Sequence, residues 1–296
     1  MSRNHKGLMS YNKFAKPFLL LGYCLLLITG VSAQSDHTLW YHQPAQYFEE
    51  SLVLGNGKMG ASVFGGIHSD KIYLNDATLW SGEPVNANMN PEAYKNLAAV
   101  RAALKNESYK LADSLNHKLQ GKFSESYAPL GTMYIDFKHH NAEHYYRELN
   151  ISESISRVSY EVKGIKYTRE YFISHPDQIM IIKLSSSQKG TLTFDIRLNS
   201  LIRFNTSSQA DRLTMKGYAP IHTEPSYRGN IPNAVIYDES KGTRFTTLVK
   251  IKNTDGSIIK SDSTIGVENG TEAIIYISIA TSFNRSEEHT SELQSL

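Results

Sequence analysis

Cysteine is almost missing from this sequence of 296 residues, since the only one is Cys24. It lies within an apolar run near the N-terminus that we expect to be removed from the mature chain. Without cysteine, the rest of the chain can form no disulfide framework and can carry out no thiol chemistry. The residue before Cys24 is Tyr23, whereas a lipidated cysteine requires a small residue there. We therefore expect neither a disulfide-stabilised fold nor a lipid anchor.

An excess of charge of one sign is also missing. The 31 basic and 29 acidic residues leave a formal net charge of +2, and the basic residues are scattered without an aromatic-interleaved cluster. This distribution gives no reason to expect a nucleic-acid partner. Hydrophobic residues make up 40% of the chain and charged residues 20%, which is ordinary for a folded domain and argues against disorder.

No apolar run is long enough to cross a membrane comfortably. The clearest run, residues 18–28, follows several basic residues and precedes Val31-Ser32-Ala33. A basic segment, a short apolar core and small residues at the end are the features of a secretory signal peptide. The sequence therefore predicts a signal peptide at residues 1–33 and a secreted or periplasmic protein without a stable membrane span. An uncleaved signal anchor is the alternative.

Strand patterns dominate the remaining sequence. From Met133 onward apolar and polar residues alternate, as they do in residues 158–163 and 192–199. Such alternation is typical of strands with one buried face. Asp255-Gly256 and Asn269-Gly270 predict hairpin turns. Many short strands joined by tight turns, without alternating helices, predict a mainly β fold: a large antiparallel two-sheet β-sandwich.

One short region interrupts this pattern with helical spacing. Asn90 can cap a helix and Pro91 suits its first position. We expect one apolar face made of Tyr94, Leu97, Ala98 and Leu104. A second helix is predicted over residues 108–119, with an inward face made of Leu111, Ala112, Leu115 and Leu119. The two helices are expected to be an excursion packed against a sheet.

The most specific stretch of the sequence lies between residues 52 and 84. It contains Gly55-Asn56-Gly57 with Gly60, then Gly65-Gly66, then Leu74-Asn75-Asp76-Ala77-Thr78-Leu79-Trp80-Ser81-Gly82. The glycines alone are typical of sharp turns. The whole pattern resembles the N-terminal β-domain of family 95 glycoside hydrolases, whose characterised members are mostly exo-acting α-L-fucosidases. Looser similarity continues through residues 126–131, 167–170, 174–177, 225–230 and 280–283.

This resemblance implies a β-sandwich domain, over residues 34–284, of a secreted enzyme that hydrolyses terminal α-L-fucosides with inversion. In the family, a glutamic acid protonates the leaving oxygen, and an aspartate with neighbouring asparagines activates water. Those groups lie in an (α/α)6 barrel that follows the β-domain, so no catalytic residue is assigned in this chain. The resemblance implies a fucosylated glycan as the substrate, bound through that barrel.

Five residues are candidates for touching substrate or a neighbouring domain: Asn75, Trp80, Ser81, His222 and Tyr227. The last two lie in residues 217–233, a stretch without periodicity that is typical of a long, functional loop. The acids near these candidates, Asp76, Glu83, Glu224 and Asp238, are not expected to be catalytic. His139, His140 and His144 lack the spacing of a zinc site, and we expect no metal and no cofactor.

The last residues of the chain are unlike the rest. Residues 285–296 resemble the in-frame translation of a common sequencing-library adapter, and the family has no counterpart for them. We interpret them as an artefactual tail on a truncated gene. The favoured function is therefore the non-catalytic N-terminal part of a glycosidase. The alternatives are a separate carbohydrate-binding β-sandwich module and a structural or adhesive domain of the cell envelope.

Overall fold

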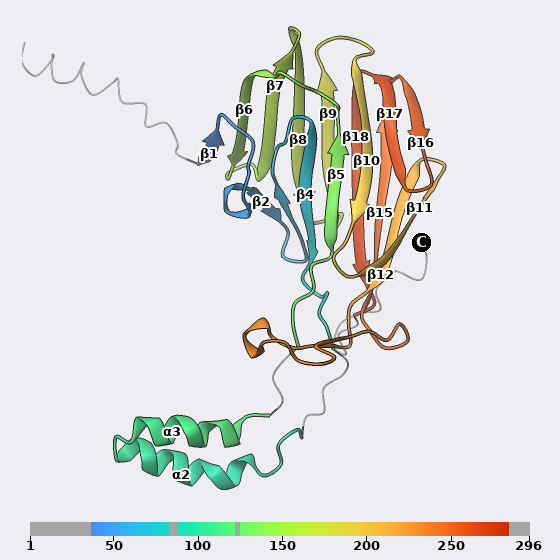
Figure 1. Cartoon of the computed structure of the whole chain (residues 1–296). Coiled ribbons are helices and arrows are strands. Elements are labelled where there is room, and N and C mark those ends of the chain that lie inside the picture. The colour runs from blue at the N-terminus through green and yellow to red at the C-terminus, as the bar shows by residue number, and fades with distance from the viewer. Residues whose placement is uncertain (1–36, 83–87, 122–124, 284–296) are drawn as a thin grey trace, which may run out of the picture. The chain divides into compact units, whose positions relative to one another are not determined.

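The computed structural model describes residues 37–82, 88–121 and 125–283, and these form a mainly β structure (Figure 1). Two antiparallel sheets, of nine and seven strands, make up the fold, and two further short strands pair with each other. The predicted antiparallel two-sheet β-sandwich is therefore confirmed. The predictions for residues 1–33, for Glu83 and for residues 285–296 lie outside the described residues.

The larger sheet takes its strands from both ends and the middle of the described chain. Its spatial order is β1 (Thr38–Tyr41), β6 (Glu143–Asn150), β7 (Ile155–Val162), β8 (Ile165–Ser174), β9 (Ile179–Ser186), β18 (Glu272–Thr281), β15 (Arg244–Asn253), β12 (Arg212–Tyr218) and β11 (Arg203–Gln209). Tight turns join many neighbours. Between β7 and β8, Lys163 and Gly164 both have positive φ, so two residues suffice to reverse the chain.

The smaller sheet contains most of the stretch that resembles the glycosidase family. Its order is β16 (Ser257–Lys260), β17 (Thr264–Gly270), β10 (Leu192–Asn199), β5 (Gly131–Asp136), β4 (Ser69–Asp76), β3 (Met59–Val63) and β2 (Leu52–Gly55). The separate pair is β13 (His222–Thr223) with β14 (Val235–Ile236). Three single 3-10 turns complete the described elements: η1 (Phe48–Glu50), η2 (His117–Leu119) and η3 (Ser226–Arg228).

Two helices, α2 (Ala93–Lys105) and α3 (Tyr109–Asn116), form the predicted excursion. The apolar face predicted for the first helix is wrong, because Tyr94, Leu97 and Leu104 are exposed. The face predicted for the second helix is confirmed in part, because Ala112 is buried but Leu111 is exposed. The buried residues of the pair are Val100, Ala103 and Ala112, and the small alanines let the helices approach each other closely. Asn90 donates to the carbonyls of Lys118 and Gln120, and α2 begins at Ala93. No helix among the described residues is long and apolar enough to span a membrane.

The hydrophobic core lies between the two sheets, and its largest fully buried side chains include two arginines. One of them, Arg169 on β8, forms an ion pair with Asp70 on β4 at 3.1 Å. Both side chains are at most 1% exposed. The pair therefore connects the two sheets through the interior of the sandwich.

The ion pair is surrounded by hydrogen bonds that satisfy most of its polar atoms. Asp70 Oδ1 accepts from the amides of Gly65 and Gly66, and Oδ2 accepts from the Tyr171 hydroxyl at 2.5 Å. Arg169 Nη1 donates to the Gly66 carbonyl, and Nη2 donates to the Tyr160 hydroxyl. Such charges are tolerated in a core only when they are paired and hydrogen-bonded in this way.

The Gly65-Gly66 turn has no room for side chains. Gly65 has a φ of +71°, and a Cβ atom there would lie 2.6 Å from the Tyr145 hydroxyl. A Cβ at Gly66 would lie 2.1 Å from the Ser69 carbonyl oxygen. The glycine pair is therefore required for the turn to present both amides to Asp70.

Replacement of Asp70 by asparagine should destabilise the fold strongly. The variant keeps the size of the side chain but leaves the Arg169 charge buried without its counter-ion, so we expect a loss of about 3–5 kcal/mol in the free energy of unfolding. Urea denaturation of the chain measures this. Glu272→Gln is the matched control, because it breaks the exposed Lys183–Glu272 pair and should cost less than about 1 kcal/mol. Equal losses in the two variants would show that the buried pair has no special role.

Candidate functional site

Three segments far apart in the sequence meet beyond the strand ends at one end of the sandwich (Figure 1). The amide of Ser81 donates to the Ser126 carbonyl at 2.8 Å, and Trp80 and Tyr127 form an isolated β-bridge. The amide of Gly82 donates to the Pro220 carbonyl at 3.0 Å. Backbone bonds thus hold the turn after β4, the segment before β5 and the loop after β12 together.

An imidazole between two carboxylates lies at this junction. His222 Nδ1 is 3.0 Å from Glu125 Oε1, and His222 Nε2 is 3.2 Å from Glu224 Oε1. The second oxygen of Glu125 accepts from the Ser81 hydroxyl at 2.7 Å and from the Thr223 amide at 3.1 Å. The hydrogen bond to Glu125 is the main cause that raises the pKa of His222 above its ordinary value of 6.5. The arrangement therefore favours a protonated imidazole.

A second group of side chains surrounds Tyr127. Its hydroxyl donates to Asn75 Oδ1 at 2.6 Å, and its ring meets the Trp80 indole edge to face, with centroids 6.3 Å apart. The indole N–H donates to the Ala77 carbonyl at 3.0 Å. Trp80 keeps 47% of its surface exposed. Burial, followed by the nearby charge of Asp76, raises the pKa of Tyr127.

Four of the five candidate residues lie in these two groups. Ser81 and His222 meet through Glu125, and Asn75 and Trp80 meet through Tyr127. Tyr227 is different: it lies in η3 with 85% of its surface exposed and has no hydrogen bond or ring contact with another described residue. Whether any of the five touches substrate stays a prediction.

Glu125 and Tyr127 were not candidates from the sequence, although both lie at the centre of the site. Tyr127 falls within residues 126–131, one of the stretches that resemble the family, and Glu125 directly precedes it. That similarity was the available signal. The contact of Glu125 with His222, 97 positions away, could not be read from spacing.

The carboxylates of this junction are engaged in hydrogen bonds with neighbouring groups. Glu125 and Glu224 bind the same imidazole, and neither lines the two cavities described below. Asp76 is buried and accepts hydrogen bonds from the amide and hydroxyl of Thr78, which fixes the turn after β4. An inverting enzyme needs two acids roughly 6.5–9.5 Å apart with a water between them. These carboxylates therefore hold the loops and the turn after β4 in position, and no catalytic acid or base is assigned to them.

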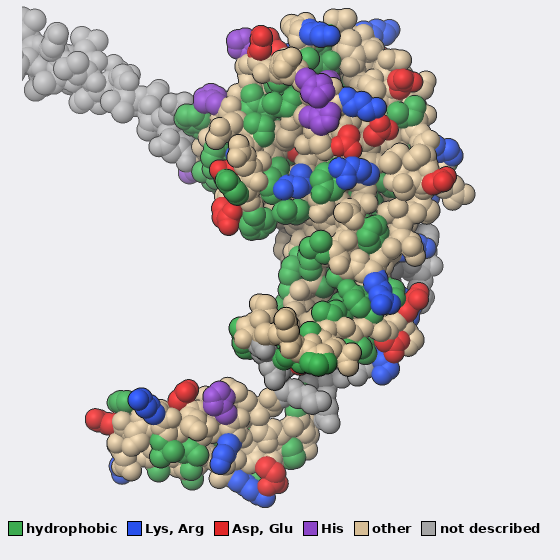
Figure 2. All heavy atoms as spheres, viewed as in Figure 1, with side chains coloured by type: hydrophobic (Ala, Val, Ile, Leu, Met, Phe, Trp, Pro, Cys, Tyr) green, Lys and Arg blue, Asp and Glu red, His purple; other side chains and the backbone are tan. Residues whose placement is uncertain are grey.

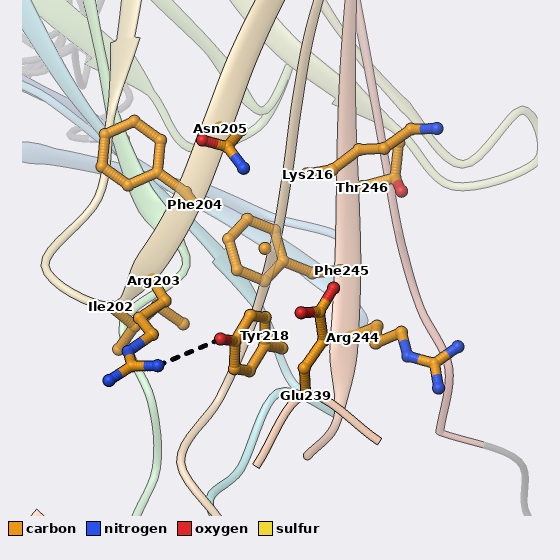
Figure 3. Close-up of a pocket in the computed structure, with 11 residues that line it drawn as sticks. Ile202, Arg203, Phe204, Asn205, Lys216, Tyr218, Glu239, Arg244, Phe245 and Thr246 are labelled. Atoms are coloured by element: carbon orange, nitrogen blue, oxygen red, sulfur yellow. Dashed lines mark hydrogen bonds between the residues drawn. The ribbon is translucent and has the colours of Figure 1, made fainter. Parts of the chain in front are cut away.

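A cavity of about 750 Å³ lies at the β11–β12–β15 edge of the larger sheet (Figure 3). Arg203 donates to the Tyr218 hydroxyl at 3.3 Å, and its guanidinium stacks on Tyr237. Figure 3 shows Arg203 and Arg244 on opposite sides of Tyr218, so these two cations do not converge on one point. A second cavity, of about 520 Å³, lies on the outer face of the smaller sheet and is lined by uncharged residues.

No group of three or more metal-ligating side chains occurs among the described residues. The three histidines that cluster in the sequence have other surroundings. His139 Nδ1 is hydrogen-bonded to the Tyr160 hydroxyl at 2.9 Å, His140 stacks on His68, and His144 has a φ of 53° in β6. Burial, followed by the charge of Arg169, lowers the pKa of His139 to about 4. His139 is therefore a neutral packing residue at neutral pH.

His139 should lower the stability of the chain as the pH falls. Its pKa is about 4 in the folded chain against an ordinary 6.5, so between these values the unfolded chain binds a proton that the native chain does not. Stability should therefore fall as the pH drops from about 6.5 to about 4. Urea denaturation across this window measures the slope, and His139→Gln should make it shallower. An unchanged slope would contradict the prediction.

His222 should behave in the opposite way. Its pKa is raised in the folded chain, so its contribution to stability is fully present below pH 6.5 and is lost as the pH rises through the raised value. NMR titration of the imidazole should show the raised pKa, and Glu125→Gln should lower it. Glu239→Gln is the control, because Glu239 lies in the same loop without contacting His222. A pKa that does not respond to Glu125→Gln would refute the assignment.

The fold and the junction together define a β-sandwich domain with loops gathered at one end. The profile described as "Glycosyl hydrolase family 65, N-terminal domain" matches residues 39–286, which is most of the chain. The chain therefore belongs to this family of glycosyl hydrolase N-terminal domains.

Proteins named as fucosidases are among its relatives. "Alpha-L-fucosidase 2" of Arabidopsis thaliana is 28% identical over 87% of this chain and 32% of its own length. "Probable alpha-fucosidase A" of Aspergillus oryzae is 26% identical over 65% of this chain and 28% of its own length. The chain thus spans about a third of the length of these two curated relatives.

Among solved structures, the one titled "Putative kojibiose phosphorylase from human microbiome" is similar over 85% of this chain and 33% of its own, with 11% identity and a TM-score of 0.43. This likeness is too distant to define the fold, which rests on the strands described above.

Proposed function

We propose that this chain is the N-terminal β-domain of a secreted, exo-acting glycoside hydrolase of family 95 that removes terminal α-L-fucosyl residues with inversion. The observation that carries the proposal is the 28% identity to a protein named as an α-L-fucosidase over 87% of this chain. The motifs that suggested family 95 are supported in their structural role, because Gly65-Gly66 and Arg169 meet at the buried Asp70. Residues 1–33 act as the signal peptide in this proposal.

The catalytic acid and the water-activating groups belong, in this proposal, to a part of the longer protein outside this chain. The curated relatives have about two thirds of their length outside the match, which leaves room for such a domain. In this proposal, the junction built by Glu125, His222 and Trp80 is the part of the β-sandwich that contacts the catalytic domain. A protonated His222 held between two carboxylates gives that end a fixed hydrogen-bonding geometry.

The alternative is a carbohydrate-binding module that works without a catalytic partner. The two proposals differ in the gene sequence after the codon for Asn284. An open reading frame that encodes a helical barrel supports the glycosidase, and it would also identify residues 285–296 as an artefact. A genuine stop codon directly after Asn284 would support the binding module.

Activity should require the longer protein. We expect the 296-residue chain to leave an aryl α-L-fucoside unhydrolysed, because this proposal assigns the acid and the water-activating groups to a part of the longer protein outside this chain. The longer gene product should convert the α-L-fucoside into β-L-fucose, because the reaction inverts the anomeric carbon. NMR spectra recorded before the free sugar mutarotates identify this anomer directly. Hydrolysis by the pure 296-residue chain would contradict the assignment of catalysis to the missing part. A longer product that is inactive on α-L-fucosides would overturn the proposed substrate.

A further inference from the structure

The cavity on the outer face of the smaller sheet is made by regular strand geometry. Ser62, Tyr73, Thr132 and Asn199 are paired in sequence across β3, β4, β5 and β10, so they form one continuous row. All four belong to the outward-facing set of their strands, and all line the cavity. With neighbouring strands about 4.8 Å apart, the row is about 14 Å long. The sheet itself therefore forms a rigid floor.

Aromatic and aliphatic side chains border this floor. Phe48 stacks on Tyr73 with ring centroids 6.1 Å apart, and Tyr127, Tyr134 and Leu201 also line the cavity. Phe48 is 58% exposed and Leu201 is 88% exposed. Flat apolar surfaces of this kind pack against the C–H face of a sugar ring. The volume of about 520 Å³ falls within the usual range for small-ligand sites, roughly 300–1,000 Å³.

Two carboxamides in the cavity are held with their N–H groups available. Asn75 Oδ1 accepts from the Tyr127 hydroxyl at 2.6 Å, and Asn199 Oδ1 accepts from the Ser200 amide at 2.9 Å. Neither Nδ2 atom donates to another described residue. Each oxygen is thus occupied while each amide nitrogen keeps two donors for a ligand. Pre-oriented donors of this kind reduce the entropic cost of binding.

Gly60 keeps the space above one of these amides open. It pairs with Asn75 across β3 and β4, and a Cβ atom at position 60 would lie 3.7 Å from Asn75 Nδ2. A larger side chain at position 60 would therefore occupy the space beside the Asn75 amide. Gly60 follows Gly55-Asn56-Gly57 in the glycine-rich motif of the sequence. This motif therefore contributes to the cavity as well as to a turn.

The residues that line the cavity are uncharged, and the cations nearest to them are held on aromatic rings. The Arg197 guanidinium lies 3.7 Å from the centre of the Tyr134 ring, and Lys71 Nζ lies 5.1 Å from the centre of the Tyr73 ring. Figure 2 shows basic and acidic side chains interspersed with hydrophobic ones over the face that it presents. An uncharged lining cannot compensate the desolvation of an ionic ligand, whereas hydroxyl and amide groups suit a neutral molecule that carries many hydroxyls. We propose that this cavity binds a neutral pyranose sugar, stacked on the tyrosines and hydrogen-bonded by Asn75 and Asn199.

The test uses the whole chain, with methyl α-L-fucopyranoside and methyl β-D-galactopyranoside as probes and saturation-transfer NMR and calorimetry as readouts. We expect saturable binding of at least one probe. Asn199→Asp keeps the acceptor for Ser200 but removes the amide donors and adds a charge, so it should weaken binding about tenfold or more. Gly60→Leu should weaken it similarly by filling the cavity. Asn205→Asp, on β11 of the other sheet, is the matched control and should bind like the wild type.

Three outcomes would overturn the proposal. They are the absence of saturable binding by either sugar, binding that survives both Asn199→Asp and Gly60→Leu, and competition of the sugar by inorganic sulfate. Thermal unfolding of each variant separates a lost site from a lost fold. The proposal does not rest on fucoside hydrolysis: galactoside binding alone would support the cavity, and an inactive longer protein would leave the cavity's binding result unchanged.

Discussion

The buried ion pair between Asp70 and Arg169 is the interaction on which the arrangement of the two sheets depends. It crosses the core from β4 to β8, and its partners include the turn between β3 and β4 and the Tyr160 and Tyr171 hydroxyls. Two buried charges are costly, and their cost is offset only while every neighbour keeps its place. The pair therefore favours one register of the sheets over others. A purely apolar interior would tolerate several registers more easily.

This network also explains why motifs far apart in the sequence occur together. The Gly65-Gly66 turn and the Arg169 strand are separated by about a hundred residues, yet the Gly66 carbonyl accepts from Arg169 at 2.8 Å and the Gly66 amide donates to Asp70 at 3.1 Å. Tyr160 extends the network to His139, whose pKa is lowered first by burial and then by the Arg169 charge. His222 has the opposite surroundings, two carboxylates and partial exposure, and the opposite pKa shift. His139 belongs to the buried network between the sheets, whereas His222 belongs to the loops at one end of the sandwich.

The sequence allowed the sheets to be predicted better than the helices or the site. Alternation of apolar and polar residues reports which face of a strand is buried, and it identified strands such as β7 and β10 correctly. Residues 179–184 are apolar apart from Lys183, yet within this run only Met180, Ile182 and Leu184 are buried. An apolar run does not reveal that Ile181 faces outward. In the helices, the largest apolar residues suggested the wrong face, because close packing selected Val100 and the alanines.

The site was harder to predict because its parts come together only through the topology. Four of the five candidates were found near one another because they lie at strand ends or in loops at the same end of the sandwich, but their connecting residues, Glu125 and Tyr127, were missed. The outer cavity was missed for a related reason. Period-two patterns mark Tyr73, Thr132 and Asn199 simply as outward-facing, and only the register places them in one row. Along each strand such residues read as ordinary solvent-facing polarity. Across the sheet they form one continuous row on the floor of a cavity whose lining residues are uncharged, and this arrangement exists only once the strands are paired.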